Sequence, residues 1–415
     1  MTMVTNPVNL IDRIESLPPF PAVASRIVAA CECENLCADR IAAIISEDPA
    51  LAARILRVAN SPFYGAAGKI TQVSRAVVRL GTIAVRNLVV GMCACDAFGA
   101  CGQSDSSHGT LWRHSVASAV AAETIAARIG FKPAEEAFLA GLLHDIGQLA
   151  IAKIVPEEFE RILHSVAGGM DLLAAERSHL RTDHAELGVR ILSRWGLPKS
   201  LCDIVGQHHE AIDPAPAPDR RLLAITMLAD IYAELMGFGF DIHSSRADSL
   251  ARIIDSLGLT PSDERLILDT LSQRTDDAFV MFEAGDRSAS DGTATSKLAV
   301  WISSAASTTH IGPLLLEQLG YETRIVTPEA FVADSTTGAM VFVAMEEAET
   351  AETFAGRIAR NLKMDVVLLA RDDDSSNRRR YEPSSRVFTI PSVFSLFDIA
   401  WVEERRNHEY RPHCR

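Results

Sequence analysis

The stretch FLAGLLHDIGQLAI, residues 138–151, sets two ionisable side chains, His144 and Asp145, inside an apolar helical segment. Burying charged groups without partners is costly. The pair therefore predicts a polar constellation in a helical core, with partners supplied by other helices. Two interpretations are open at this point: a working metal centre, or the remnant of one that now only supports the fold.

Helical periodicity surrounds this stretch from residue 7 to about residue 285. Segments such as AVASRIVAAC (22–31) and LWRHSVASAVAAETIAARIG (111–130) repeat apolar residues three and four positions apart, which is typical of helices that bury one face. Gly130 and Gly147 stand where C-terminal helix caps are expected. The pattern predicts a mainly α domain.

The pattern changes after residue 285. Residues 286–296, DRSASDGTATS, are polar and without apolar period, which is typical of a flexible linker. Beyond them come short apolar runs of strand length, separated by helical segments: LAVWI (298–302), TRIV (323–326), MVFVAM (340–345), DVVLLA (365–370) and VFTI (387–390). Continuous apolar strands with helices between them predict a parallel sheet covered on both faces. We therefore expect a smaller α/β domain over residues 297–405 and a tail over 406–415.

Composition narrows the function classes. The 415 residues carry a formal net charge of −14, which argues against a broad nucleic-acid or anionic-membrane surface. We find no leader-like N-terminus and no uninterrupted apolar span, so we expect a cytoplasmic protein without membrane insertion. The eight cysteines lack the paired spacing of a zinc site and predict reduced thiols.

Further histidines and carboxylates lie inside apolar helical frames between residues 110 and 235, and with the central pair they form a set of candidate metal ligands: His114, His144, Asp145, His184, His208, His209 and Asp230. Imidazole and carboxylate ligands together suit Fe, Mn or Zn, and such ions activate water for attack on phosphorus. Each residue alone is also explained as a buried hydrogen-bonding group. As a set, His114, His144, Asp145 and Asp230 are the residues that we expect to converge.

The order of several motifs resembles one family, the HDOD (HD-related output domain) family of bacterial signalling proteins. The motifs that carry the resemblance span roughly residues 10–235: LPPFPAVASRIV, ISEDPALAARILRVANSPFYG, ITQVSRAVVRLGTIAVRNLVVG, WRHSVASAVAAETIA, AFLAGLLHDIGQL, DHAELGVRILSRWGLP and HHE. The resemblance implies an HDOD domain over residues 7–285, with an N-terminal helical subdomain of about 7–105 and an HD-like helical bundle of about 106–285.

The resemblance also implies a site. His114, His144, Asp145 and Asp230 would occupy the metal-ligand positions of an HD phosphohydrolase, with His184, His208 and His209 as second-metal or substrate ligands. Members of the family are regarded as non-catalytic regulatory or interaction modules. Two departures from the hydrolases agree with that role: the chain reads AIDPAPAPDRR (211–221) where cyclic di-GMP phosphodiesterases of the HD-GYP class carry their GYP motif, and Gln148 stands where hydrolases often have Lys.

The α/β region resembles the receiver domain of two-component response regulators, a flavodoxin-like fold. The chemical positions of a receiver are changed at the ends of its predicted strands, which read Ser303-Ser304, Ala344-Met345, Ala370-Arg371 and Ile390-Pro391. The resemblance therefore implies a degenerate receiver-like domain without a phosphoacceptor.

Two functions remain open. The first is a non-catalytic output protein of bacterial signal transduction that acts through signalling proteins, a second copy of itself, or a small ligand such as a nucleotide or cyclic dinucleotide. The alternative is a metal-dependent phosphohydrolase that cleaves a nucleotide or cyclic dinucleotide, with a divalent Fe, Mn or Zn as its cofactor. The sequence assigns no catalytic residue beyond the metal ligands.

Overall fold

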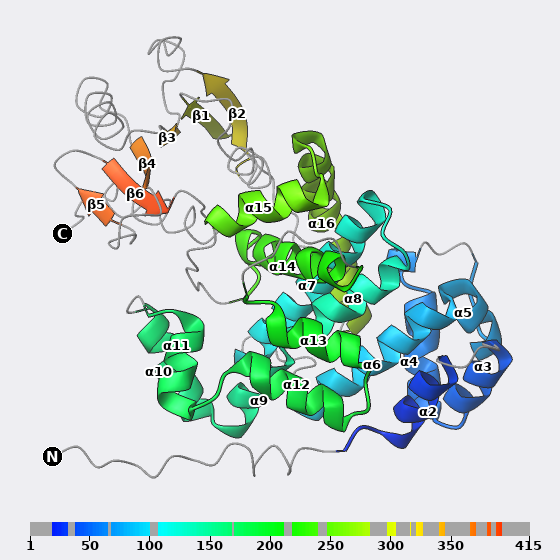
Figure 1. The fold of residues 1–415 in the computed structure, drawn as a ribbon. Coiled ribbons are helices and arrows are strands. Elements are labelled where there is room, and N and C mark those ends of the chain that lie inside the picture. Colours follow the sequence, from blue (N-terminus) through cyan, green and yellow to red (C-terminus); the bar gives the residue numbers. More distant parts are fainter. Residues whose placement is uncertain are drawn as a thin grey trace, which may run out of the picture.

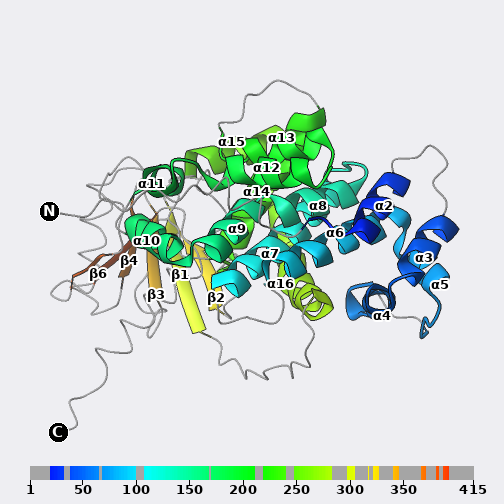
Figure 2. The ribbon, with the colours of Figure 1, turned by 90° about the horizontal axis from the view of Figure 1, so that it is seen from below.

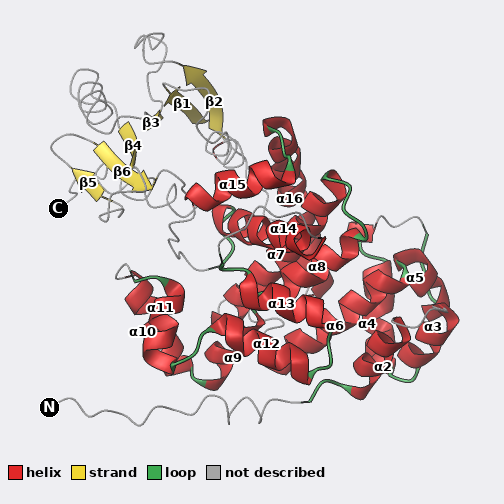
Figure 3. Cartoon of the chain, viewed as in Figure 1, coloured by secondary structure: helices red, strands yellow, loops and turns green. Residues whose placement is uncertain are grey.

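The computed structural model describes most of the chain up to residue 282 and parts of the chain beyond it. Helices dominate the first part, and the described residues after 297 are almost all in strands (Figure 3). The described residues are 19–31, 38–64, 68–99, 107–167, 170–210, 218–239, 247–282, 297–303, 316, 321–326, 340–344, 366–370, 380–382 and 387–391. The predicted linker 286–296 and tail 406–415 lie outside them.

The first helices form one end of the helical part, opposite α10 and α11 (Figures 1 and 2). Their bounds are α2 (Ala22–Cys31), α3 (Ala38–Ser46), α4 (Pro49–Ala59), a 3-10 turn η1 (Pro62–Tyr64), α5 (Val73–Leu80) and α6 (Thr82–Phe98). Asp48 starts α4 because its carboxylate accepts hydrogen bonds from the backbone of Ala50 and Leu51, with Pro49 at the first position. The chain enters this end through Phe20, whose ring stacks on Trp195 at 5.0 Å between centroids.

The remaining helices surround the candidate site. They are α7 (Ser107–Arg128), α8 (Ala134–Leu143), α9 (Ile146–Ile154), α10 (Pro156–Ala167), α11 (Leu172–Leu180), α12 (His184–Arg194), α13 (Lys199–Gln207), α14 (Pro218–Leu235), α15 (Ala247–Leu257) and α16 (Pro261–Phe282). The long helix α7 packs against α8, α14 and α16, while α12 packs against α9 and α13. The predicted helical domain is thus confirmed as mainly α.

The HDIG stretch is not one continuous helix. α8 ends at Leu143, and α9 begins at Ile146, so His144 and Asp145 lie in the turn that joins them. Asp145 precedes α9 but makes no capping bond, which leaves its carboxylate free to face other helices. Gly147, expected as a helix end, instead lies inside α9, where it allows close contact with α12.

One apolar stretch, Ala134–Ile154, is long and apolar enough to cross a membrane, but 89% of its most apolar window is buried inside the fold. A second candidate, Val73–Leu80 with Thr82–Phe98, is bent by 106°. The first is explained as core, because α8 and α9 are enclosed by α7, α12 and α13. The cytoplasmic location stays a prediction.

Strands after residue 297 form one sheet with the order β2-β1-β3-β4-β6-β5. The strands are β1 (Lys297–Ser303), β2 (Tyr321–Val326), β3 (Met340–Ala344), β4 (Val366–Ala370), β5 (Arg380–Glu382) and β6 (Val387–Pro391). All pairs are parallel except β5 with β6, which is antiparallel. The five predicted strands are present, and the short β5 was not expected. The helices expected between them lie outside the described residues, apart from Leu316.

The cysteines follow the prediction only in part. Cys31, Cys93 and Cys202 are free thiols, as expected, and burial raises the pKa of Cys93 to about 12. Cys95, by contrast, is disulfide-bonded, which corrects the expectation that all these thiols are reduced.

Candidate metal centre

All the candidate ligands predicted from the sequence lie close together among the helices from α7 onward. His114 comes from α7, Asp230 from α14, and His184 is the first residue of α12. His208 and His209 directly follow α13, and the central pair lies in the α8–α9 turn. Every one of these residues is buried except His209, which is half-buried. The sequence-predicted set is therefore a single constellation drawn from separate helices.

The first cluster consists of His114, His144, Asp145 and Asp230. The Nε2 atoms of the two histidines lie 3.3 Å apart. Oδ2 of Asp145 is 3.6 Å from Nε2 of His114 and 3.4 Å from Nε2 of His144. Oδ1 of Asp230 approaches the same two nitrogens at 3.2 and 3.5 Å. The convergence predicted for these four residues is present in the fold.

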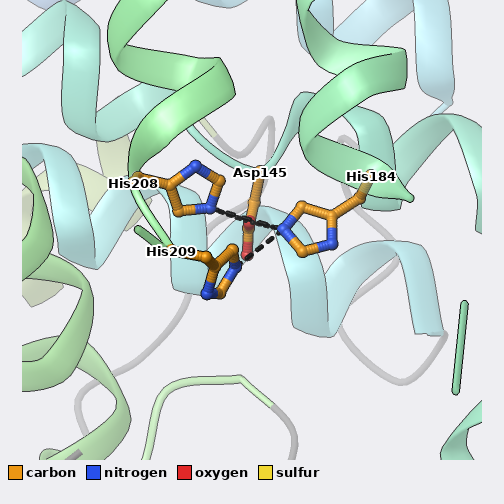
Figure 4. Close-up of side chains that lie close together, drawn as sticks. All are labelled: Asp145, His184, His208 and His209. Carbon is orange, nitrogen blue, oxygen red and sulfur yellow. Dashed lines mark hydrogen bonds and ion pairs between the residues drawn. The ribbon is translucent and has the colours of Figure 1, made fainter. Parts of the chain in front are cut away.

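The second cluster consists of Asp145, His184, His208 and His209, which turn their polar atoms toward one another (Figure 4). Oδ1 of Asp145 lies 3.3 Å from Nε2 of His184 and 3.3 Å from Nε2 of His208. Nε2 of His184 is also 3.3 Å from Nε2 of His208 and 2.8 Å from Nε2 of His209. Asp145 thus belongs to both clusters, with one carboxylate oxygen facing each.

Hydrogen bonds behind the rings fix which nitrogen faces inward. Nδ1 of His144 lies 2.8 Å from the Gly141 carbonyl, Nδ1 of His208 2.7 Å from the Val205 carbonyl, and Nδ1 of His114 3.1 Å from the Phe238 carbonyl. A carbonyl oxygen only accepts, so each Nδ1 carries a proton, and in the neutral ring each Nε2 presents a lone pair to the cluster. Histidine ligands of metal sites are oriented in this way.

Glu176 orients the fourth ring. This carboxylate of α11 is fully buried, and its Oε2 accepts hydrogen bonds from Nδ1 of His184 at 2.7 Å and from the His184 backbone amide at 2.9 Å. A carboxylate behind a ligating histidine fixes the ring and increases its basicity. Glu176 could not be singled out from the sequence, because nothing in LLAAERSHL distinguishes it from a solvent-exposed helix residue.

Glycines let the helices that carry the ligands approach closely. A Cβ atom on Gly147 would lie 1.9 Å from the carbonyl oxygen of His184, and one on Gly141 would lie 2.5 Å from the carbonyl oxygen of Ser118. Both obstacles are backbone atoms, so neither could move aside as a side chain does. The glycines therefore set the spacing of α9 with α12 and of α8 with α7.

Charges in the two clusters shift the pKa values of the ligands. Burial opposes ionisation throughout, but carboxylate charge outweighs it at His144, whose pKa rises well above its usual value, and at His114, whose pKa also rises. Burial is likewise outweighed at His184 by Glu176, which raises the pKa of His184 to about 9. Burial lowers the pKa of His208. The surrounding imidazoles hold the pKa of Asp145 well below its usual range despite burial.

The donor set fits divalent metal ions. Ligand atoms about 2.1 Å from one ion lie about 3.0 Å apart in octahedral geometry and about 3.4 Å apart in tetrahedral geometry. The distances in the first cluster, 3.2 to 3.6 Å, match the tetrahedral arrangement. Oδ1 of Asp145 is buried without a hydrogen-bond partner and faces histidine lone pairs. Acceptors that face one another require protons or a cation between them, and the buried group could bind a metal.

Comparisons with known proteins identify the domain. Residues 17–211 match the sequence model of the HDOD domain. An HDOD domain protein of unknown function from Geobacter sulfurreducens is 29% identical, and the match covers 66% of this chain and 98% of that chain with a TM-score of 0.55. This chain therefore contains an HDOD domain, which is a domain of the signalling type.

Other relatives extend the comparison. A provisionally assigned signal transduction protein from Marinobacter aquaeolei VT8 is 26% identical, with a TM-score of 0.55 over 68% of this chain and 62% of that one. A provisionally assigned phosphohydrolase from Shewanella amazonensis SB2B is 24% identical, with a TM-score of 0.52 over 67% of this chain and 99% of that one, and shares the fold. An uncharacterized protein of Treponema pallidum (strain Nichols) is 26% identical over 54% of this chain, which spans 43% of that protein's length.

Proposed function

We propose that this protein is a regulatory output protein of bacterial signal transduction whose HDOD domain holds a two-ion metal centre. The observation that carries the proposal is Asp145, whose two carboxylate oxygens face two separate groups of histidine lone pairs. A single carboxylate between two donor groups is suited to bridge two cations. Fe, Mn and Zn are the ions that such imidazole and carboxylate donors favour.

The ligand roles follow from the clusters. His114, His144, Asp145 and Asp230 would hold the first ion, and Asp145, His184, His208 and His209 the second. When bound, such ions act as Lewis acids and lower the pKa of coordinated water. The chain itself contributes the oriented rings, the buried Glu176 and the exclusion of bulk water from all ligands except His209.

A regulatory role is favoured over turnover because three cationic side chains on the helices around the site are already engaged. Arg177 pairs with Asp183, Arg113 lies over the ring of Phe279 at 3.7 Å, and Lys153 donates to the Ala97 carbonyl. Phosphoryl transfer needs cationic groups that neutralise the substrate phosphates. Binding of a protein partner or of a small ligand needs no such groups.

Metal analysis tests the proposal. We expect about two ions per wild-type chain after anaerobic purification, about one in Asp230→Ala and in His209→Ala, and none in Asp145→Ala. Asp203→Ala is the matched control, because Asp203 pairs with the exposed Lys199 on α13 and belongs to neither cluster. A wild-type protein that neither carries nor takes up Fe²⁺, Mn²⁺ or Zn²⁺ refutes the metal centre.

The second candidate is a metal-dependent phosphohydrolase acting on a nucleotide or cyclic dinucleotide, and the pair of adjacent ion sites favours it. It requires turnover of cyclic di-GMP, nucleoside triphosphates or bis(p-nitrophenyl) phosphate by the metal-loaded protein, and loss of that turnover in Asp145→Ala. Binding of cyclic di-GMP without turnover, measured by calorimetry, would instead support a ligand-sensing role.

We extend the proposal to the C-terminal sheet. The parallel strand order β2-β1-β3-β4-β6 is that of flavodoxin-like folds, which supports a degenerate receiver-like domain. The antiparallel β5 departs from that pattern. Such a domain, without a phosphoacceptor, would serve as an interaction surface for a signalling protein or a second copy of the chain. Affinity capture from cells and sedimentation of the full chain test the two partners separately.

A further inference from the structure

Gln148 lies beside the first cluster but is not one of the proposed ligands. It follows Asp145 by three residues, near the start of α9, and is 3% exposed. Its Nε2 group donates a hydrogen bond to Oδ2 of Asp145 at 2.8 Å. Residues three apart at a helix start lie on one side, so the side chain reaches back to the carboxylate that both clusters share.

This contact fixes the orientation of the amide. Turning the carboxamide over would place its oxygen against the Asp145 carboxylate, and two acceptors repel each other. The nitrogen therefore faces Asp145, and Oε1 faces elsewhere. Oε1 is buried and has no hydrogen-bond partner among the residues that the structure describes. Buried acceptors without a donor are rare in native proteins, because leaving one unsatisfied costs about 1–3 kcal/mol.

The unsatisfied oxygen must lie close to the first cluster. In an amide the nitrogen and oxygen are about 2.3 Å apart. Since Nε2 is 2.8 Å from Oδ2 of Asp145, Oε1 lies within about 5 Å of that atom. A small molecule that donates a hydrogen bond to Oε1 would therefore also lie near the first cluster.

We propose that Gln148 selects the molecule held beside the first cluster: its carboxamide oxygen accepts a hydrogen bond from water or another neutral donor and disfavours phosphate-type oxyanions. This inference rests on the metal centre proposed above. The oxygen atoms of a fully ionised phosphate are acceptors only, and they meet another acceptor at Oε1. The amide cannot turn to donate instead, because its nitrogen is held by Asp145. The site thus favours neutral donors over phosphate esters.

Phosphate binding by the Co²⁺-loaded full-length protein tests the inference, with Co²⁺ as a spectroscopic reporter and calorimetry as a second readout. Metal content is measured first in each protein. A phosphate monoester such as phenyl phosphate carries no proton above its second ionisation, and at such a pH we expect Gln148→Lys to bind it at least tenfold more tightly than the wild type, because an ammonium group donates charge-assisted hydrogen bonds. The d–d spectrum should then change at correspondingly lower phenyl phosphate concentrations.

Gln72→Lys is the matched control, since it adds the same charge at the exposed residue that precedes α5. We expect it to bind phenyl phosphate like the wild type. Equal tightening in both lysine variants would show a general charge effect and overturn the inference. Wild-type affinity as high as that of Gln148→Lys would overturn it as well.

Gln148→Met decides the question if the lysine variant loses its ions, because methionine keeps the chain length and removes the acceptor. We expect phenyl phosphate affinity above that of the wild type; unchanged affinity in a metal-loaded Gln148→Met protein overturns the role of Gln148 and leaves the metal centre standing. A wild-type protein that cannot be loaded with Co²⁺ overturns both.

Discussion

Substitution of Gly147 by alanine should open the centre without replacing any of the proposed ligand side chains. The added Cβ would meet the His184 carbonyl oxygen at 1.9 Å, its carbonyl carbon at 2.7 Å and its Cα at 2.9 Å. These are backbone atoms at the start of α12, so relief requires that the two helices separate. An ordinary contact needs about 3.4 Å, which means a separation of about 1.5 Å.

That separation is enough to break the second cluster. His184 and Asp145 lie at the facing ends of α12 and α9, with 3.3 Å between Nε2 and Oδ1. Adding the displacement along this line gives about 4.8 Å, too long for one ion about 2.1 Å from each ligand. Overpacking of this kind costs about 1–3 kcal/mol, and we expect the upper end because backbone must move. For a domain of this size the loss lowers Tm by about 6–12 °C.

Calorimetry measures the fall in Tm, and metal analysis of the same protein measures the loss of the second ion. Gly206→Ala is the control: Gly206 also lies inside a helix, α13, so both variants gain the same helix propensity, but its Cβ would meet only a methyl group of Val189 at 3.0 Å. We expect that control to keep its Tm and both ions. If Gly147→Ala kept the wild-type Tm and two ions per chain, the close contact between α9 and α12 would not position the site.

Three further predictions concern other contacts. Glu176→Gln should weaken the second ion about 10–100-fold and leave the first unchanged, because the charge behind His184 is removed; competition with a chelator measures both constants, and equal weakening of the two ions would contradict the assignment. Hydrogen bonds from Thr260, together with Arg128, lower the pKa of Asp263 to about 2, so its ionised form contributes stability that is present above its ordinary pKa of 3.8 and is lost as pH falls toward 2. Asp263→Asn should therefore have a lower urea midpoint than the wild type near neutral pH, with a gap that closes in acid; a gap independent of pH would rule out this linkage. Phe20→Ala should cost about 1–2 kcal/mol by removing the stack on Trp195, as measured by urea unfolding, and an unchanged midpoint would show that the contact adds no stability.

The convergence of the candidate ligands could be predicted from the sequence because these residues are exceptions in an apolar pattern. His114 and Asp230 stand out since most of their neighbours on α7 and α14 are small or apolar. The residues that support them could not be predicted in the same way. Glu176 reads as an ordinary helical carboxylate, and Gln148 differs from a surface glutamine only by its position. Their roles depend on which helices meet, and that is a property of tertiary packing.

The turn between α8 and α9 could not be predicted from the sequence for a related reason. The apolar run through residues 138–151 predicts one helix, whereas the chain turns at His144 and Asp145. A continuous helix would point these adjacent side chains about 100° apart. The turn instead brings Nε2 of His144 and Oδ2 of Asp145 to 3.4 Å of each other. Periodicity records which residues are buried, but it does not record where a helix is interrupted to make two ligands converge.

Burial also separates the two proposed functions in physical terms. In the first cluster each ligand is at least 95% buried, so a large substrate would have to displace packed helices to reach it. The half-buried His209 makes the second cluster the more accessible of the two. A cyclic dinucleotide phosphodiesterase must admit two phosphates and two bases, while a regulatory centre needs only to exchange an ion or a small ligand. Restricted access of this kind is compatible with the regulatory role proposed above and would hinder hydrolysis of a cyclic dinucleotide.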